Sequence, residues 1–256
     1  MAIVTITSDL GTHDYYLAAL KGAIYTHCDT VTITDVTHQV KTFDIRQAAF
    51  ITRSVYRYFP KGSIHIVHVN AADSNGKLLV AMVDDHYFIT FDNGILSLAF
   101  DKMPHRTYQV NDELLENSSR LFETAIAKVV ELLTKEYMPN DFGHPATESI
   151  TMRLLQPSNK PGNIRGTVIY IDHFGNAITN ITKQMFDEYI GNRKFSIITN
   201  AASTDTISRN YTDVEEGEMV CMFNASGLLE VAINKGKAEH LLGLKTDVSA
   251  ILIICD

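Results

Sequence analysis

Short apolar runs alternate with segments of helical periodicity along the first half of the chain. The apolar runs predict strands at residues 3–7, 31–36 and 63–69, followed by a hairpin of two strands at 78–83 and 87–91. Apolar residues at helical spacing predict helices at residues 14–26, 43–58 and 122–137. Strands that alternate with helices predict an N-terminal α/β domain with a mostly parallel sheet, covered by helices on both faces.

The pattern changes at residues 139–161, which contain four of the six prolines: Pro139, Pro145, Pro157 and Pro161. Such a concentration of proline is typical of a connection between domains. Beyond it, short strands are expected at residues 164–171, 194–199, 219–223, 228–233 and 248–254, and helices at 183–189 and 237–242. The sequence therefore predicts an α/β domain over residues 1–150 and, over 160–256, a C-terminal domain that forms an antiparallel β-sheet or barrel.

The composition argues against several classes of protein. The 256 residues are 45% hydrophobic, and the net charge of −8 with scattered basic residues disfavours a nucleic-acid groove or an anionic membrane surface. No apolar run reaches the roughly 18 residues of a membrane span, and the first strand begins too early for a signal peptide. Three cysteines without CxxC spacing are typical of reduced thiols, which predicts a cytoplasmic protein.

A metal centre is not expected from the ten histidines. The sequence has neither an HExxH nor a His-x-His pattern, and a metal site needs ligands that converge. His65 and His68 share one expected strand, but their spacing places them on opposite faces. The sequence therefore predicts no metal and no cofactor.

Residues 171–180, with the sequence IDHFGNAITN, carry the first candidate chemistry. Asp172, Phe174 and Asn176 follow an expected strand, and Gly175 between them allows close backbone approach. A carboxylate, an aromatic face and an amide together suit a nucleoside, which offers ribose hydroxyls, a flat base and a polar edge. The alternative is a tight turn with a capping aspartate and a core phenylalanine.

A second segment, residues 3–16 with the sequence IVTITSDLGTHDYY, places Asp9 directly after the first strand. Ligands of open α/β sheets bind outside the carboxyl ends of the strands, where Asp9 is expected. The alternative role of Asp9 is to cap the helix expected at residues 14–26.

The two segments together resemble the S-adenosylmethionine hydroxide adenosyltransferases, relatives of the fluorinases and chlorinases. The resemblance extends in order along nearly the whole chain, through DVTH at 35–38, FDI at 43–45, AAF at 48–50, FPKG at 59–62, DNG at 92–94 and NASGLLEVAIN at 224–234. It implies that S-adenosylmethionine is the substrate and that the protein is a homotrimer. Each ligand would lie between the N-terminal domain of one subunit and the C-terminal domain of its neighbour.

The resemblance also implies roles for individual residues. Asp9 matches the ribose carboxylate, and Asp172, Phe174 and Asn176 match the residues that hold methionine and the nucleoside. Residues 224–232, including Asn224, Ala225 and Ala232, match the segment that contacts the adenine edge through backbone groups.

The chain departs from the family where water is activated. Members that use water have an aspartate, an arginine and a histidine, which here align with Asn70, Lys77 and Asn117. Asn70 cannot accept a proton at neutral pH, Lys77 lacks the planar guanidinium fork, and Asn117 cannot shuttle a proton. Asp73 is the nearby candidate for a substitute carboxylate. Its alternative role is in a hairpin turn between the strands at 63–69 and 78–83.

The sequence thus predicts slow hydrolysis of S-adenosylmethionine to adenosine and methionine, by attack of water at C5′. The alternative is a non-catalytic protein that binds adenosine or S-adenosylmethionine. An unrelated α/β hydrolase is disfavoured because no GxSxG elbow is present. Halide chemistry is disfavoured because the serine and the insertion of the fluorinase-type pocket are not found. The expected partners are a small nucleoside and further copies of this chain, not nucleic acid or a membrane.

Overall fold

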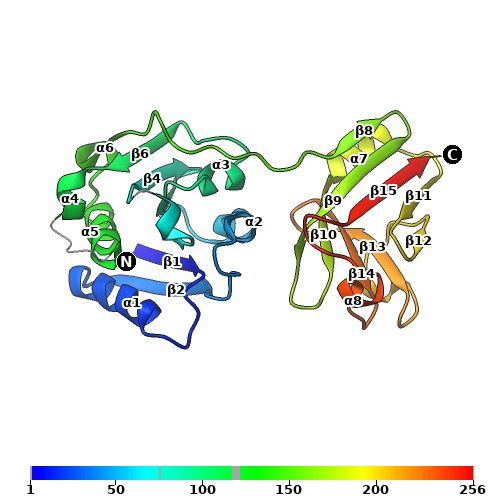
Figure 1. Ribbon diagram of the computed structural model, residues 1–256, viewed down its shortest axis with the longest axis horizontal. Coiled ribbons are helices and arrows are strands. Elements are labelled where there is room, and N and C mark those ends of the chain that lie inside the picture. The colour runs from blue at the N-terminus through cyan, green and yellow to red at the C-terminus, as the bar shows by residue number, and fades with distance from the viewer. Residues whose placement is uncertain (1, 75, 117–121, 256) are drawn as a thin grey trace. The chain divides into compact units, whose positions relative to one another are not determined.

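A computed structural model describes residues 2–74, 76–116 and 122–255 of the chain. These residues form two compact units, which divide between residues 154 and 155 (Figure 1). The N-terminal unit combines helices with a mixed sheet, and the C-terminal unit is mostly antiparallel strands. The predicted fold classes of both halves are therefore confirmed.

The described part of the N-terminal unit has a seven-stranded sheet in the order β2-β1-β3-β5-β4-β6-β7. Its first four strands in this order pair in parallel, and the remaining strands pair antiparallel. The bounds are β1 (Ala2–Ser8), β2 (Val31–Thr37), β3 (Ile64–His68), β4 (Leu78–Val83), β5 (His86–Phe91), β6 (Arg106–Val110) and β7 (Gly143–Pro145). Residues 139–145, within the proline-rich stretch, form α6 (Pro139–Phe142) and β7 of this unit.

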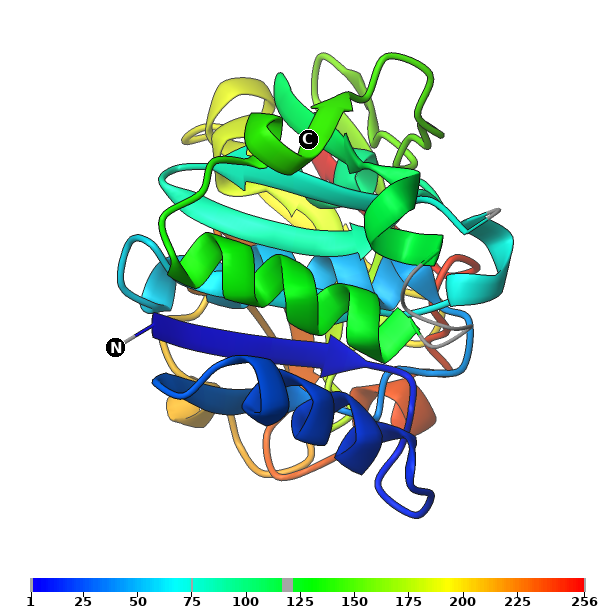
Figure 2. The ribbon, with the colours of Figure 1, turned by 90° about the vertical axis from the view of Figure 1, so that its left-hand side faces the viewer.

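Helices cover both faces of this sheet, as the alternating pattern predicts. Side chains of β3 alternate between two cores: Ile64 and Ile66 pack with α1 (Tyr16–His27) and α5 (Phe122–Thr134), whereas Val67 packs with α2 (Ile45–Val55) and α3 (Ile95–Ala99). Figure 2 shows α1 and α5 lying across one face. The remaining helical segments are α4 (Asp112–Glu116) and the 3₁₀ turns η1 (Tyr56–Tyr58) and η2 (Ala71–Ser74).

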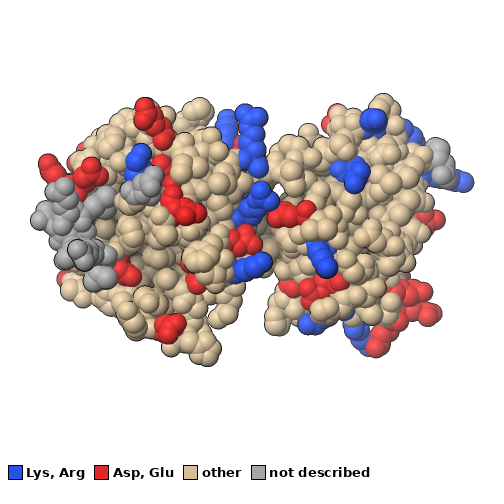
Figure 3. Space-filling view, viewed as in Figure 1, with Lys and Arg blue, Asp and Glu red and all other residues tan. Residues whose placement is uncertain are grey.

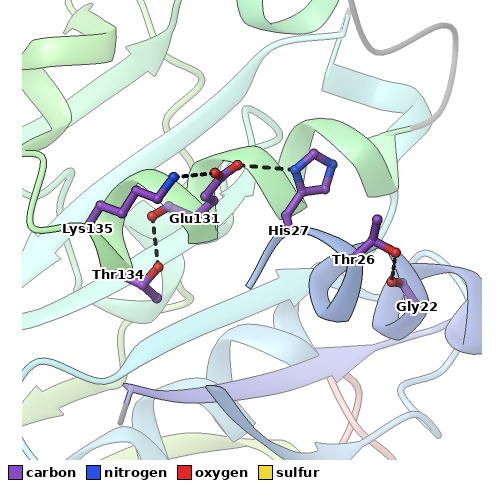
Figure 4. A network of polar contacts seen from close by, with 6 residues as sticks. All are labelled: Gly22, Thr26, His27, Glu131, Thr134 and Lys135. Carbon is purple, nitrogen blue, oxygen red and sulfur yellow. Dashed lines mark hydrogen bonds and ion pairs between the residues drawn. The ribbon is translucent and has the colours of Figure 1, made fainter. Parts of the chain in front are cut away.

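The carboxylate of Glu131 links the end of α1 to α5 (Figure 4). Glu131 of α5 accepts a hydrogen bond from Nζ of Lys135 at 2.6 Å and lies 3.1 Å from Nδ1 of His27. Lys135 lowers the pKa of Glu131 below its usual value, burial opposes this effect, and His27 adds to it. The last turn of α1 is thereby tied to α5.

The described part of the C-terminal unit has an eight-stranded antiparallel sheet, in which β12-β11-β15-β9-β10-β14-β13 follow one another and β8 pairs with β9. Because β12 also lies against β13, the sheet curls into a nearly closed barrel. The bounds are β8 (Ser158–Lys160), β9 (Asn163–Ile171), β10 (Ala177–Thr182), β11 (Phe195–Ile198), β12 (Ser203–Thr204), β13 (Met219–Phe223), β14 (Leu228–Ile233) and β15 (Ala250–Cys255), with α7 (Lys183–Tyr189), η3 (Tyr211–Asp213) and α8 (Ala238–Leu241).

Two sequence-based expectations are corrected by the strand order. The residues around Asp73 do not connect a hairpin, because β5 lies between β3 and β4 and pairs with both. Residues 177–182, where no strand was expected, form β10, and residues 172–176 are therefore a tight hairpin turn between β9 and β10. Both differences concern which strands pair, a non-local property that apolar periodicity does not encode.

No helix in the described ranges combines the length and apolar character needed to cross a membrane. On the face drawn in Figure 3, both units carry acidic and basic side chains, and uncharged surface separates most of them.

Candidate functional site

Asp9 joins three loops at the carboxyl end of the N-terminal sheet. It follows β1, and its Oδ2 accepts hydrogen bonds from the backbone N–H groups of Phe43 at 2.9 Å and Asn70 at 3.4 Å. Phe43 and Asn70 both have positive φ angles, 67° and 50°, which bulky residues seldom adopt. The expected alternative, capping of α1, is wrong: Tyr15 holds the N-cap position, without a side-chain hydrogen bond. Oδ1 of Asp9 has no partner among the described residues and is free for a ligand.

Asp73 lies beside the position where the family resemblance expects a carboxylate. Nδ2 of Asn70 donates to Oδ2 of Asp73 at 2.7 Å, within the short turn η2. Asp73 is exposed, so that water reaches its carboxylate. The structure therefore brings Asp9, Asn70 and Asp73 together at one sheet edge.

Lys77 and Asn117 occupy the other two positions of the family's water-activating triad. The backbone carbonyl of Lys77 accepts from the N–H of Asp92 at 3.1 Å, and its ammonium pairs with no residue in the described ranges. Asn117 lies outside the described residues. An imidazole does occur nearby, at His68, the last residue of β3, but it packs edge-on against Phe91 with ring centres 5.0 Å apart.

Ser8, directly before Asp9, forms a buried hydrogen-bonded pair with His38. The hydroxyl of Ser8 is hydrogen bonded to Nδ1 of His38 at 2.8 Å, and Nε2 of His38 lies 3.1 Å from Oδ1 of Asp35. Burial raises the pKa of Asp35, but hydrogen bonds from Lys21 and His38 outweigh it and hold this pKa below its usual value. Asp35 and His38 are the first and last residues of the DVTH segment, one of the motifs that carry the family resemblance.

The turn at residues 172–176 is organised by its aspartate. Oδ1 of Asp172 accepts from the backbone N–H groups of Phe174 at 2.9 Å and Asn176 at 2.8 Å, and Oδ2 accepts from Nδ2 of Asn176 at 3.0 Å. The expected alternative is therefore right about the aspartate, which holds the turn. It is wrong about the phenylalanine, because Phe174 is 71% exposed and does not lie in the core.

Gly175 lets this turn approach another segment of the C-terminal unit. Its φ is +81°, and a Cβ there would lie 2.8 Å from Cβ of Lys237. Its carbonyl also accepts from the N–H of Glu239 at 2.9 Å. Asn176 is buried, so that the turn presents an exposed aromatic ring on a rigid base.

The remaining predicted residues lie at two ends of β14. Ala232 is buried in β14 and is adjacent to Val231, which pairs with Ala177 directly after the turn. Asn224 and Ala225 lie at the other end, where Oδ1 of Asn224 accepts from two backbone N–H groups of the β13–β14 turn. The structure thus brings Ala232 close to the 172–176 turn and places Asn224 and Ala225 away from it.

Tyr211 and Glu230 form a polar pair that the sequence analysis missed. The hydroxyl of Tyr211 donates to Oε1 of Glu230 at 2.7 Å, and Glu230 is only 4% exposed. The signal for Glu230 was a single charge inside the apolar strand LLEVAI. Among the described residues, no group of histidine, cysteine and carboxylate side chains is arranged to hold a metal ion.

Comparison with known protein families identifies the class. Residues 4–143 match the S-adenosylmethionine hydroxide adenosyltransferase N-terminal domain, and residues 166–249 match the C-terminal domain of the same family. The chain belongs to this family, as the ordered set of motifs predicts.

Curated relatives cover nearly the full length. An (R)-S-adenosyl-L-methionine hydrolase of Methanocaldococcus jannaschii is 26% identical over 94% of this chain and 92% of its own length. One from Thermus thermophilus is 25% identical over 99% of this chain and 100% of its own length, and a fluorinase of Actinoplanes is 22% identical over 96% of each.

Solved structures share the fold. An uncharacterized conserved protein of Thermotoga maritima matches with a TM-score of 0.83 and 22% identity, over 98% of this chain and 99% of its own. A conserved hypothetical protein of Thermus thermophilus matches with a TM-score of 0.75 and 24% identity, over the whole of both chains.

Proposed function

We propose that this protein hydrolyses S-adenosylmethionine to adenosine and methionine, with Asp73 as the carboxylate that activates water. The proposal is supported by the family membership and by the full-length hydrolase relatives. The observation that carries it is the hydrogen bond from Asn70 to Asp73, which supplies a carboxylate next to the position where the family's aspartate is replaced.

Hydrolysis of S-adenosylmethionine needs little acid catalysis from the protein. The water oxygen forms a bond to C5′ while the bond between C5′ and sulfur breaks, and sulfur keeps the electron pair as a neutral thioether. Asp73 accepts the proton that water loses and passes it to solvent. The protein must align water opposite the sulfur and hold the nucleoside still.

The free oxygen of Asp9 is assigned to the ribose hydroxyls, because Oδ2 is occupied by backbone N–H groups. The exposed ring of Phe174 is assigned to stacking on the base. A cytoplasmic location is also proposed, because Cys28, Cys221 and Cys255 are free thiols.

The test follows adenosine and methionine release by chromatography in water enriched in ¹⁸O. Wild type should release both slowly, with the label in the 5′ hydroxyl of adenosine. Asp73→Asn should lower the rate about 10²-fold or more, since a positioned base is worth roughly 10²–10⁴-fold. The asparagine can still accept a hydrogen bond from Asn70, so the loop should keep its shape.

Asp29→Asn is the matched control, because Asp29 is an exposed aspartate of the same unit in a turn away from the sheet edge. It should hydrolyse at the wild-type rate. Turnover that survives Asp73→Asn would contradict the assignment of Asp73. No release by any variant, with adenosine still bound, would instead support the non-catalytic alternative.

A further inference from the structure

Asn93 is a buried asparagine whose amide contacts the loop that carries Asn70 and Asp73. It lies shortly after β5 and is only 2% exposed. Its Nδ2 donates to the backbone carbonyl of Val69 at 2.9 Å and to that of Asn70 at 3.2 Å, and its Oδ1 accepts from the N–H of Ile95 at 3.3 Å. Two carbonyls and one N–H define which end of the amide donates, so the orientation of this side chain is fixed.

The bond from Asn93 completes a set of contacts that holds Asn70 through its N–H, its carbonyl and its side chain. The N–H of Asn70 donates to Oδ2 of Asp9 at 3.4 Å, and its Nδ2 donates to Oδ2 of Asp73 at 2.7 Å. Its φ of 50° lies in the left-handed region, where a residue stays when the contacts around it fix its backbone. Asn93 therefore orients the peptide that follows Asn70 and leads into η2.

The segment around Asn93 also holds the far end of the same loop. The N–H of Asp92 donates to the carbonyl of Lys77 at 3.1 Å, so the segment contacts the loop between β3 and β4 at both of its ends. Oδ1 of Asp92 in turn accepts from the N–H of Ile150 at 2.9 Å. Asp73 lies between the two held ends, and its position therefore depends on the segment after β5.

A purely structural role for Asn93 is the alternative. In that role its amide extends the pairing of β3 with β5 beyond the ends of the strands, as the hydroxyl of Thr90, which donates to the carbonyl of Val67 at 3.0 Å, does within them. The bond to Val69 serves this role, whereas the bond to Asn70 reaches the residue that binds Asp73. The two roles therefore differ in whether the effect of Asn93 passes through Asp73.

We propose that Asn93 is a positioning residue for hydrolysis, which acts through Asn70 to hold the carboxylate of Asp73 against the attacking water. The inference rests on the proposed function, since it takes Asp73 as the base. A base must lie within hydrogen-bond reach of the proton that it takes, and a misplacement of about 1 Å costs up to roughly 10²-fold in rate. Asn93 acts on the loop and not on the ligand, because its amide is buried and bonded to the backbone.

The first experiment measures release of adenosine from S-adenosylmethionine by Asn93→Ala and Asn93→Ser. Asn93→Ala removes both donated bonds and should lower kcat about tenfold or more, while KM and the affinity for adenosine stay within about twofold of wild type. Binding should persist because Oδ2 of Asp9 keeps its bond from the N–H of Phe43. The hydroxyl of Asn93→Ser can donate to one carbonyl, so this variant should recover part of the lost rate.

Thr90→Val is the matched control. It also removes a buried donor that joins β5 to a backbone carbonyl of β3, since Thr90 is 1% exposed, but that carbonyl belongs to Val67 and not to the loop. Thr90→Val should lower the unfolding temperature and leave kcat at the wild-type value. A loss of kcat in Thr90→Val as large as that in Asn93→Ala would mean that any weakening of the β3–β5 contact slows the reaction, and would overturn the inference.

A double-mutant cycle with Asp73→Asn separates positioning from a general loss of structure. If Asn93 acts through Asp73, Asn93→Ala should cause no further loss of kcat in the Asp73→Asn protein. Losses that multiply, or a kcat of Asn93→Ala equal to that of wild type, would overturn the inference. Thermal unfolding checks that the variants are folded, and Asn93→Ser enters the same cycle if Asn93→Ala does not fold.

Failure of the proposed function gives a different result. A wild-type protein that releases no adenosine, or an Asp73→Asn protein that hydrolyses S-adenosylmethionine at the wild-type rate, would refute Asp73 as the base, and the inference with it. A slow Asp73→Asn protein in which Asn93→Ala slows the reaction further would leave the proposed function intact and refute the inference alone.

Discussion

Asp9 holds its loop through one carboxylate oxygen, whereas Asp172 uses both of its oxygens within the 172–176 turn. Oδ2 of Asp9 and Oδ1 of Asp172 each accept two backbone N–H groups, so that each carboxylate fixes the loop around it. A carboxylate held in this way is already oriented when a ligand arrives, which lowers the entropic cost of binding. Substitution of either residue therefore has two effects, one on the loop and one on the ligand.

The two effects can be separated at Asp172. Asp172→Ala should weaken adenosine binding by roughly 1.5–3 kcal/mol and also lower the unfolding temperature, because it removes the acceptor of two backbone N–H groups. Asp172→Asn retains an acceptor and should weaken binding with little change in unfolding temperature. Calorimetry and thermal unfolding of the two variants check this; unchanged affinity in both would contradict the site.

Phe174 allows a test of binding that is separate from the stability of the fold. Phe174→Ala should weaken adenosine binding by roughly 1.5–3 kcal/mol through loss of the stacking face, without destabilising the fold, since the ring is 71% exposed. Val248→Ala, which truncates another exposed apolar side chain of the same unit, is the control and should bind as wild type. Calorimetry measures both; an equal affinity for Phe174→Ala and wild type would remove this ring from the site.

At the scale of elements, the β9–β10 turn depends on its glycine for conformation and for space. Gly175→Ala should lower the free energy of unfolding by more than Gly217→Ala does. Both glycines have positive φ, which costs alanine roughly 1–2 kcal/mol, but only Gly175 would also press against Lys237. Urea unfolding of the two variants checks the order. Equal losses in the free energy of unfolding would mean that the contact with Lys237 adds no cost.

The sheet of the N-terminal unit carries a buried histidine pair. Nδ1 of His65 is hydrogen bonded to the hydroxyl of Thr5 at 2.8 Å, and Nε2 lies 3.0 Å from Nδ1 of His86. Burial, followed by the neighbouring His86, lowers the pKa of His65 to about 3. His65 is therefore neutral in the folded protein at every pH near neutrality.

This pair predicts a loss of stability in acid. Above about pH 6.5 His65 is neutral in both states, and its full contribution is present. As pH falls from 6.5 towards 3, only the unfolded chain gains this proton, and stability declines by roughly 1.4 kcal/mol per pH unit. Urea unfolding at several pH values should show a shallower decline for His65→Gln than for wild type; identical slopes would contradict the shifted pKa.

At the scale of the whole molecule, the protein is expected to be a homotrimer. Light scattering should give three times the mass of one chain, and a monomer that still binds nucleoside would contradict the expectation. The resemblance also implies that one subunit contributes Asp9 to a ligand and its neighbour contributes Asp172.

Subunit mixing tests this sharing. Asp9→Ala and Asp172→Ala proteins should each bind adenosine weakly, but an equal mixture, unfolded and refolded together, should recover about a quarter of the wild-type sites. The reason is that a quarter of randomly formed neighbouring pairs combine an intact Asp9 with an intact Asp172. Separately refolded and then combined proteins are the control, and absence of recovery in the mixture would place both residues of each site in one chain.

The sequence by itself determined the class of fold and the family. Strand and helix periods are local properties, and they predicted β1, β2 and β3, the covering helices and the antiparallel second unit. The ordered motifs predicted the family, and the family match confirms it. The roles of the individual site residues remain predictions.

Only the tertiary structure decided which chemistry-bearing groups meet. It inserted β5 between β3 and β4, exposed Phe174, and joined Asp9 to the loops of Phe43 and Asn70. It also paired Tyr211 of η3 with Glu230 of β14. The physical reason is that periodicity fixes which face of an element is apolar, whereas the partner of each strand and of each polar group is set by contacts between residues far apart in the sequence.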